Sequence, residues 1–258
     1  MKDRNFDDLV EKFERNVYQS IKGTIRLSVL KRDLQMTLDN LSLQSSPRCL
    51  DSGAGSGRFA QQLVDQGCEV SLCDISAKSL HLAKQNLNVK PHQQSPSFLN
   101  VAIQDLPVEY NNQFDLILNH AVLEWTAHPQ TIVQRLSQLL KPGGQLSLMF
   151  YNKDALVWRN LLFGHFRKVW NDDMANQGRG LTPQLPIVSD DVEQWLKNYG
   201  LRVLKRTGVR VLYDYLDDDV LARTPTDKLL QLELELSENP KYLYLGRYLH
   251  FICQKDID

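Results

Sequence analysis

Residues 49–59, CLDSGAGSGRF, decide the fold. An apolar run ends there in three glycines at alternate positions, Gly53, Gly55 and Gly57. Glycine is costly inside a helix or a strand, so a chain keeps it where a side chain would block a close approach. Glycines that end a strand and open a helix bring bare backbone amides beside a ligand at the carboxyl edge of a parallel sheet.

Outward from this loop, apolar runs alternate with helical patterns. The sequence predicts strands at 48–53, 68–76, 97–103, 114–122 and 145–152, helices at 57–66, 76–88 and 129–140, and a Lys-Pro-Gly-Gly turn at 141–144. Strands that alternate with helices of about ten residues indicate a parallel sheet covered on both faces.

The two ends of the chain complete the predicted organisation. Residues 5–41 show helical spacing and predict two helices separated near Gly23. After Tyr151 the alternation stops, and it resumes with a helix at 190–199, a strand at 201–215, a helical stretch at 217–237 and a strand at 247–255. We expect one domain, 1–258, made of N-terminal helices (1–44), a core (45–150), an insertion (151–188) and a C-terminal part of the sheet (189–258).

Composition excludes several classes of protein. The 258 residues carry a net charge of −1, so a nucleic-acid partner would have to meet a local basic patch. The sequence has neither an apolar run of about 20 residues nor a signal peptide, which predicts a cytoplasmic protein without a membrane span. We expect Cys49, Cys68, Cys73 and Cys253 to be buried thiols, and the scattered histidines predict no metal site.

Asp74 ends the second predicted strand, 19 residues after Gly55. A carboxylate at this position can accept both hydroxyl groups of a ribose. The alternative is a simple helix cap, because Ser76 opens the next helix. The glycine loop and Asp74 both fall where a nucleoside-binding sheet requires them, which favours the interpretation that Asp74 binds a ribose. A dinucleotide-binding loop is less favoured, because its pattern is GxGxxG and no second nucleotide-binding half follows.

The loop instead resembles the DxGxGxG loop of the class I methyltransferases, which accommodates the methionine part of S-adenosylmethionine. Longer motifs resemble the bacterial tRNA 5-carboxymethoxyuridine methyltransferases: RNFDD at 4–8, Tyr18 with Lys22 and Gly23, HAVLEW at 120–125, LSLMFYN at 146–152, TGVRV at 207–211 and LGRY at 245–248. The resemblance implies an α/β Rossmann-like fold, with a seven-stranded, mostly parallel sheet and an antiparallel last strand. It also implies methylation of the carboxyl group of the wobble uridine of tRNA.

The resemblance implies a cofactor site as well. Its members are Arg26, Gly53, Ala54, Gly55, Asp74, Ile103, Gln104 and His120. Arg26 offers a fork to the methionine carboxylate, and without the resemblance it could equally be a solvated arginine. His120 would lie beside the sulfonium, or would otherwise be a satisfied histidine at a strand end. Many relatives bind the adenine amine with an acid at the position of Ala102, so Gln104, a backbone carbonyl or Asp105 would have to replace it here.

The sequence indicates the residues that bind the substrate less clearly than those that bind the cofactor. A carboxylate is ionised at pH 7 and needs no general base, so we expect no catalytic acid or base. Candidates to hold the substrate are Tyr151, Arg210 and Arg247, with Asn152, Tyr213 and Tyr215 nearby. Any one of these tyrosines could instead be a core residue.

The insertion has five cations and three acids between Tyr151 and Pro183, a net charge of +2. The cations are Lys153, Arg159, Arg167, Lys168 and Arg179, interleaved with Trp158, Phe163, Phe166 and Trp170. Cations for phosphates and aromatic rings for unstacked bases suit a single-stranded RNA loop. The alternative is an amphipathic helix that packs Trp158, Leu161, Leu162 and Phe166 inward.

Three other functions remain open. A small-molecule O- or N-methyltransferase would share residues 48–150, although it would need an apolar cap. A non-catalytic protein with a decayed loop is disfavoured by the intact Gly53, Gly55 and Asp74. An oxidoreductase is weaker still.

Overall fold

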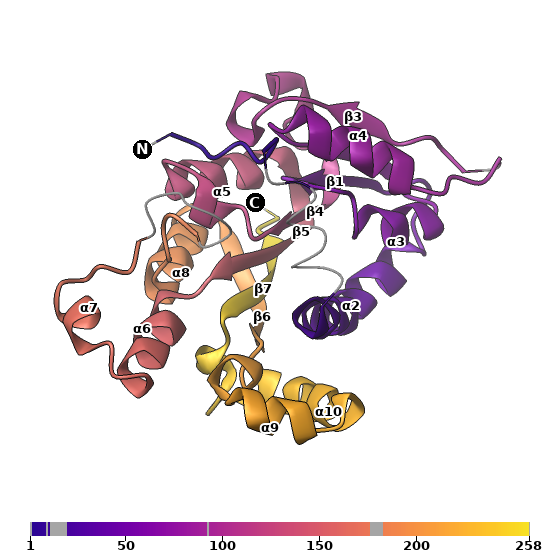
Figure 1. Cartoon of the computed structure of the whole chain (residues 1–258). Coiled ribbons are helices and arrows are strands. Elements are labelled where there is room, and N and C mark those ends of the chain that lie inside the picture. The colour runs from indigo at the N-terminus through magenta and orange to yellow at the C-terminus, as the bar shows by residue number, and fades with distance from the viewer. Residues whose placement is uncertain (1, 9, 11–19, 92, 176–182, 258) are drawn as a thin grey trace.

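Seven strands form one sheet at the centre of the computed structural model, which describes residues 2–8, 10, 20–91, 93–175 and 183–257 (Figure 1). In chain order the strands are β1 (Arg48–Ser52), β2 (Glu69–Cys73), β3 (Ser97–Leu99), β4 (Phe114–His120), β5 (Leu140–Tyr151), β6 (Leu201–Val209) and β7 (Tyr248–Lys255).

The order of the strands across the sheet is β3-β2-β1-β4-β5-β7-β6. Neighbours among β1 to β5 are parallel, whereas β7 is antiparallel to both β5 and β6. The predicted fold, a mostly parallel sheet with an antiparallel last strand, is therefore confirmed. The strand order reverses between β1 and β4, and open α/β sheets bind their ligands at such a point.

Helices cover both faces of the sheet (Figure 1). One face carries α2 (Ile21–Leu41), α3 (Ala60–Asp65) and α4 (Ala77–Asn86), and the other carries α5 (Pro129–Leu139) and α8 (Ser189–Asn198). After β6 come α9 (Asp218–Arg223) and α10 (Thr226–Ser237), and α10 packs against α2. Because both faces are covered, the central strands are buried along almost their whole length.

The helices α6 (Lys153–Leu162) and α7 (Phe166–Trp170) project beyond the end of β5, away from the layered core (Figure 1). Asn152 joins them to the core. Its side chain accepts from Asp154 N at the start of α6, and it donates to Tyr244 O at 2.8 Å and Gly246 O at 3.0 Å. Asn152 therefore has a structural role, and it is no longer a candidate to bind substrate.

The N-terminal prediction is confirmed in part, since Val10 and the residues of α2 are helical, and it is wrong for residues 5–8. Residues 5–8 are extended or in a turn, because their polar side chains bind the core: Asp7 Oδ1 accepts from Ser76 Oγ at 2.6 Å. Gly23 lies in the first turn of α2, where its N–H donates to the capping Ser20, so it does not separate two helices. Residues 9 and 11–19 of the predicted helix lie outside the described residues.

Other boundaries also differ from the prediction. The 141–144 turn is part of β5, because Leu140 already pairs with Phe114. β6 ends at Val209, since Arg210 adopts φ +61° and cannot continue a strand. Proline has no N–H to donate, and Pro225 accordingly divides the predicted helical stretch into α9 and α10.

Candidate functional site

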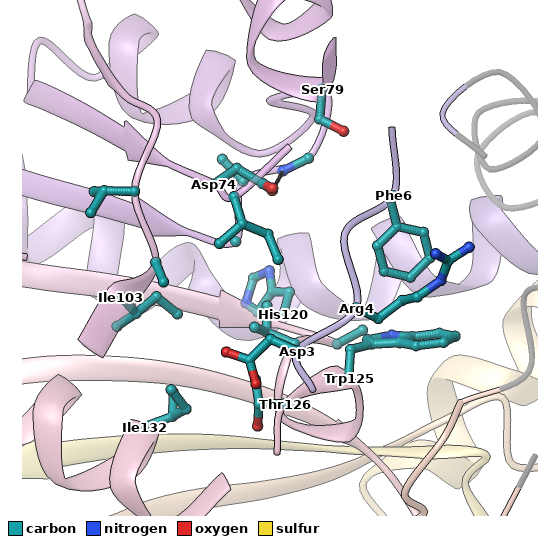
Figure 2. A pocket seen from close by; sticks show the side chains of 18 of the residues that line it. Asp3, Arg4, Phe6, Asp74, Ser79, Ile103, His120, Trp125, Thr126 and Ile132 are labelled. Carbon is teal, nitrogen blue, oxygen red and sulfur yellow. Dashed lines mark hydrogen bonds between the residues drawn. The ribbon is translucent and has the colours of Figure 1, made fainter. Parts of the chain in front are cut away.

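The carboxyl ends of the parallel strands place the predicted residues at one edge of the sheet. Ser52 is level with Cys73, and Cys73 is level with Leu99, so the loops that follow β1, β2 and β3 meet. A pocket opens at this edge (Figure 2). All eight residues predicted to bind the cofactor line it: Arg26, Gly53, Ala54, Gly55, Asp74, Ile103, Gln104 and His120.

The glycine loop contributes space rather than free amides. Gly53 N and Ala54 N both donate to Cys73 O, at 2.8 and 3.1 Å, and Gly55 N donates to the Asp74 carboxylate. The expectation of bare amides is therefore wrong for these three residues. A Cβ added to Gly53 would lie 2.4 Å from Val122, whereas one added to Gly55 would meet nothing within 4 Å. A side chain on Gly55 would occupy the open space that a ligand can use.

Asp74 is held rigidly at the end of β2. Its Oδ2 accepts from Gly55 N and its Oδ1 accepts from Ser76 N, both at 2.8 Å. Burial raises the pKa of Asp74, while these two backbone hydrogen bonds act in the opposite direction. Ser76 itself caps α4, so Asp74 is not the helix cap. Each carboxylate oxygen keeps a lone pair for a bound hydroxyl group.

His120 stands at the end of a buried chain of hydrogen bonds. Its Nε2 is 2.7 Å from Ser147 Oγ, which is 2.8 Å from His250 Nε2, and His250 Nδ1 is 2.8 Å from Asp33 Oδ2. Burial lowers the pKa of His120 well below its usual value, so the ring is neutral at pH 7. Its Nδ1 is buried without a hydrogen-bond partner among the described residues, and the residue lines the pocket.

Sequence reasoning missed one wall of the pocket. Asp3, Arg4 and Phe6, from the extended N-terminal segment, line it together with Trp125, and the Phe6 and Trp125 rings pack edge to face at 4.7 Å (Figure 2). The polar RNFDD motif was a signal of this role, but the helical spacing that follows it hid the extended conformation. Asp105 is exposed and does not line the pocket.

The predicted substrate residues Tyr151, Arg210 and Arg247 do not line this pocket but form a cluster beside it. The Arg247 guanidinium lies 4.9 Å from the centre of the Tyr151 ring. Arg210 and Arg26 lie 5.5 and 4.4 Å from the ring of Tyr248, which packs edge to face on Tyr151. Arg26 belongs to both sites, so the cluster adjoins the pocket.

Two members of this cluster have unused polar atoms. The hydroxyl of Tyr151 and the Nε and Nη1 of Arg247 are buried and make no hydrogen bond to a described residue. Burial raises the pKa of Tyr151 to about 12, so its hydroxyl stays protonated. Buried polar groups normally find partners, so these atoms are exceptions. Tyr151 is 2% exposed and packs in a core cluster with Leu156 and Met174, in agreement with the alternative of a core tyrosine.

A buried carboxylate shapes the loop that presents Arg210. Glu233, from α10, accepts the N–H groups of Val211, Leu212 and Tyr213 at 2.8, 3.2 and 2.7 Å. Arg210 itself has φ +61° and forms an ion pair with Asp214 at 2.9 Å. Such backbone conformations cost about 1–3 kcal/mol and persist where surrounding contacts impose them, often at functional sites.

A groove on α6 and α7 leads to the cluster. Its lining includes Arg159, Arg167 and Lys168 from these helices and reaches Arg247. The aromatic side chains nearby are exposed, with Trp158 at 46%, Phe166 at 51% and Trp170 at 84%. The alternative in which the helix packs its apolar side chains inward is therefore wrong for Trp158, Leu162 and Phe166, whereas Leu161 is half-buried. Arg179 lies outside the described residues.

The sheet order, the glycine loop and the acid at the end of β2 together define a class I methyltransferase. A family model described as "Methyltransferase domain" matches residues 50–148. The chain is 40% identical over 255 residues to the tRNA 5-carboxymethoxyuridine methyltransferase of Escherichia coli (strain K12), an alignment that covers 99% of this chain and 97% of that protein. The chain belongs to this family.

More distant relatives share parts of the chain or only its fold. A malonyl-[acyl-carrier protein] O-methyltransferase of Enterobacter lignolyticus is 29% identical over 134 residues, which are 50% of this chain and 51% of that protein. The structure of magnesium protoporphyrin IX methyltransferase from Synechocystis PCC 6803, with bound SAH, superposes with a TM-score of 0.62. That match is 14% identical and covers 97% and 96% of the two chains, and it shows the fold alone.

The cofactor is S-adenosylmethionine, and the pocket suits it. A rigid carboxylate with unused lone pairs, a buried guanidinium and open space above Gly55 match a nucleoside that carries an amino acid. None of the described helices is long and apolar enough to cross a membrane. Nor do three His, Cys, Asp or Glu side chains gather within metal-binding reach among the described residues.

Proposed function

We propose that this protein methylates the carboxyl group of 5-carboxymethoxyuridine at the wobble position of tRNA, giving the methyl ester. The observation that carries the proposal is the arginine–tyrosine cluster beside the cofactor pocket, in a chain that matches a tRNA 5-carboxymethoxyuridine methyltransferase over almost its whole length. Guanidinium groups recognise carboxylates, and Arg210 and Arg247 supply two of them beside the pocket.

Each of the eight predicted pocket residues has a proposed part in holding the cofactor. Asp74 accepts the ribose hydroxyls, Arg26 pairs with the methionine carboxylate, and the loop 53–55 leaves room for the methionine chain. Ile103 and Gln104 flank the adenine, and the neutral His120 lies beside the sulfonium. When bound, the cofactor supplies a methyl group that is electrophilic because it is attached to a positively charged sulfur.

The proposed reaction needs orientation more than acid–base chemistry. The substrate carboxylate is already ionised at neutral pH, so the transfer forms an O–CH3 bond without moving a proton. Arg247 lines the groove that reaches the cluster, and its guanidinium is the donor proposed to hold this carboxylate. Arg210 already pairs with Asp214, which moderates its charge and avoids quenching the nucleophile. Holding the two reactants in line then supplies most of the acceleration.

We further propose that α6 and α7 hold the anticodon loop. Their groove is lined by Arg159, Arg167 and Lys168 and reaches Arg247. If α6 and α7, which we call the cap, bind the phosphates of the anticodon loop, the wobble base can reach the cluster around Arg247. The exposed Trp158, Phe163, Phe166 and Trp170 can stack on unpaired bases. A tRNA substrate and four buried free thiols both suit a protein of the cytoplasm.

The test is methylation of tRNA purified from cells that lack this enzyme, measured by mass spectrometry of the wobble nucleoside. Arg247→Ala should lower kcat/KM about 100-fold, because a buried charge-assisted contact is worth roughly 2–5 kcal/mol. Arg247→Lys should recover only part of the activity. The matched control is Arg202→Ala, an exposed arginine at the opposite end of β6 from Arg210, which should retain full activity.

Two outcomes would contradict the proposal. Full activity of Arg247→Ala on this tRNA would remove the cluster from substrate binding. Efficient methylation of a free small molecule, with no activity on the tRNA, would instead support a small-molecule O- or N-methyltransferase.

A further inference from the structure

The N-terminal segment forms a wall of the cofactor pocket (Figure 2). Its backbone is tied to the core at Arg4, whose N–H donates to Trp125 O at 3.0 Å. The Asn5 side chain donates to Ile75 O at 3.1 Å, directly after Asp74. A segment far from the core in sequence is therefore part of the nucleoside site.

Asp3 is the first pocket residue of this segment. Its Oδ2 accepts from Gln104 Nε2 at 2.8 Å, and its Oδ1 accepts from Ala127 N at 2.7 Å. These partners follow β3 and β4 respectively, so the carboxylate is fixed between two loops of the sheet edge. Each oxygen can accept a second hydrogen bond, which leaves Asp3 able to receive a donor from a ligand.

The position of the base follows from the two ends of the pocket. With the ribose at Asp74 and the methionine chain at the glycine loop, the base lies toward the residues that follow β3. The pocket is apolar there, lined by Ile75, Val101, Ile103 and Ile132. Asp3 and Asp74 are the two acids among the described lining residues, so Asp3 is the carboxylate left for the base.

We propose that Asp3 accepts a hydrogen bond from the exocyclic amine of the cofactor's adenine. It thereby replaces the acid that is absent at Ala102, and it makes the N-terminal segment part of cofactor selection. Adenine presents a donor at this position, whereas hypoxanthine presents a carbonyl oxygen that a carboxylate repels. The inference rests on the proposed placement of the ribose at Asp74.

The test compares calorimetric affinities for S-adenosylhomocysteine and S-inosylhomocysteine, with no tRNA present. The wild type should prefer the adenine ligand at least tenfold. Asp3→Ala should bring the ratio of the two affinities close to one. Asp3→Asn should bring it to one or below, because an amide can donate to the hypoxanthine oxygen. The ratio isolates base recognition, since any loosening of the segment weakens both ligands alike.

Asp7→Ala is the matched control. Asp7 anchors the same segment through Ser76 Oγ at 2.6 Å and Lys78 N at 3.2 Å, but it does not line the pocket. Its loss should lower the affinity for both ligands by the same factor and leave the preference for the adenine ligand unchanged. Equal affinity of the wild type for both ligands would overturn the proposal, as would an unchanged preference in Asp3→Asn. If the ribose placement were the error, Asp74→Ala would bind both ligands as tightly as the wild type does.

Discussion

The cofactor pocket and the cap helices α6 and α7 are built on opposite principles. In the pocket, polar side chains are held by hydrogen bonds to other parts of the protein, as Asp74 is by Gly55 N and Ser76 N. On the cap, aromatic rings such as Trp170 are exposed, and α7 has five residues, none of them buried.

This difference matches what each region would bind. A small cofactor gains affinity from a rigid, preformed site, because little order has to be imposed on binding. An RNA loop is held by stacking and by charge, which tolerate movement and depend on salt. The pocket should therefore respond to single substitutions with large effects, and the cap should respond with smaller ones that vary with ionic strength.

The largest effect expected is that of Asp74→Ala on cofactor affinity. In the proposed site, the substitution would remove charge-assisted hydrogen bonds to two ribose hydroxyls, each worth roughly 1.5–3 kcal/mol. Calorimetry should show S-adenosylmethionine binding weakened by about 100-fold, with the affinity for tRNA unchanged. The control is Asp105→Ala, which removes an exposed acid outside the pocket and should bind the cofactor normally. Unchanged affinity in Asp74→Ala would exclude it from the site.

Much of the pocket could be predicted from the sequence because it depends on local backbone geometry. The glycines at 53, 55 and 57 all have positive φ, and the acid after β2 follows from strand register. Asp3 could not be predicted, since its position depends on hydrogen bonds to Gln104 and Ala127 from far along the chain.

The late loop was misassigned for a related reason. The apolar pattern continues past Val209 and predicts a longer strand, whereas the buried Glu233 binds three successive N–H groups and turns the chain after Arg210. A carboxylate 22 residues away along the chain leaves no local signal in that pattern. The exposed aromatic face of the cap was also ambiguous, because helical spacing alone does not say which face is covered.

Glu124 lies in the turn Leu123–Trp125 that follows β4, next to the pocket residue Trp125, and it makes the stability of the fold sensitive to pH. It is fully buried. Burial raises its pKa to about 7, against the smaller opposing effects of backbone hydrogen bonds and of nearby Arg26. Because the pKa is raised in the folded protein, the stabilising contribution is complete below about pH 4.5 and is lost as the pH rises through 7.

Glu124→Gln should therefore be more stable than the wild type at pH 8, by up to about 3 kcal/mol, and should show no such advantage at pH 5. Urea unfolding at the two pH values measures this. Part of the pH dependence should remain in the variant, since burial also raises the pKa of Asp51 to about 7. An equal difference between the two proteins at both pH values would show that Glu124 is not protonated in the fold.

The smallest effect expected is on the cap, and it tests the comparison directly. Arg167 and Lys168 are exposed on α7 and line the groove that reaches Arg247. Replacing both by alanine should weaken tRNA binding about tenfold near physiological salt and leave cofactor affinity unchanged. The slope of log K against log salt should fall by about 0.7 for each phosphate contact removed.

A control variant separates phosphate contacts from general loss of charge. Lys197→Ala removes an exposed cation from the last turn of α8, away from the cap groove, and should leave both the affinity and the slope unaltered.

Trp170→Ala should act differently from the double variant, because stacking is lost without a change in the number of ions released. The affinity for tRNA should fall while the slope stays constant. If the double variant keeps the wild-type affinity and slope, phosphates are not held on α7. The RNA would then be positioned by the cluster around Arg247 alone, and the contrast between a rigid pocket and an electrostatic cap would fail.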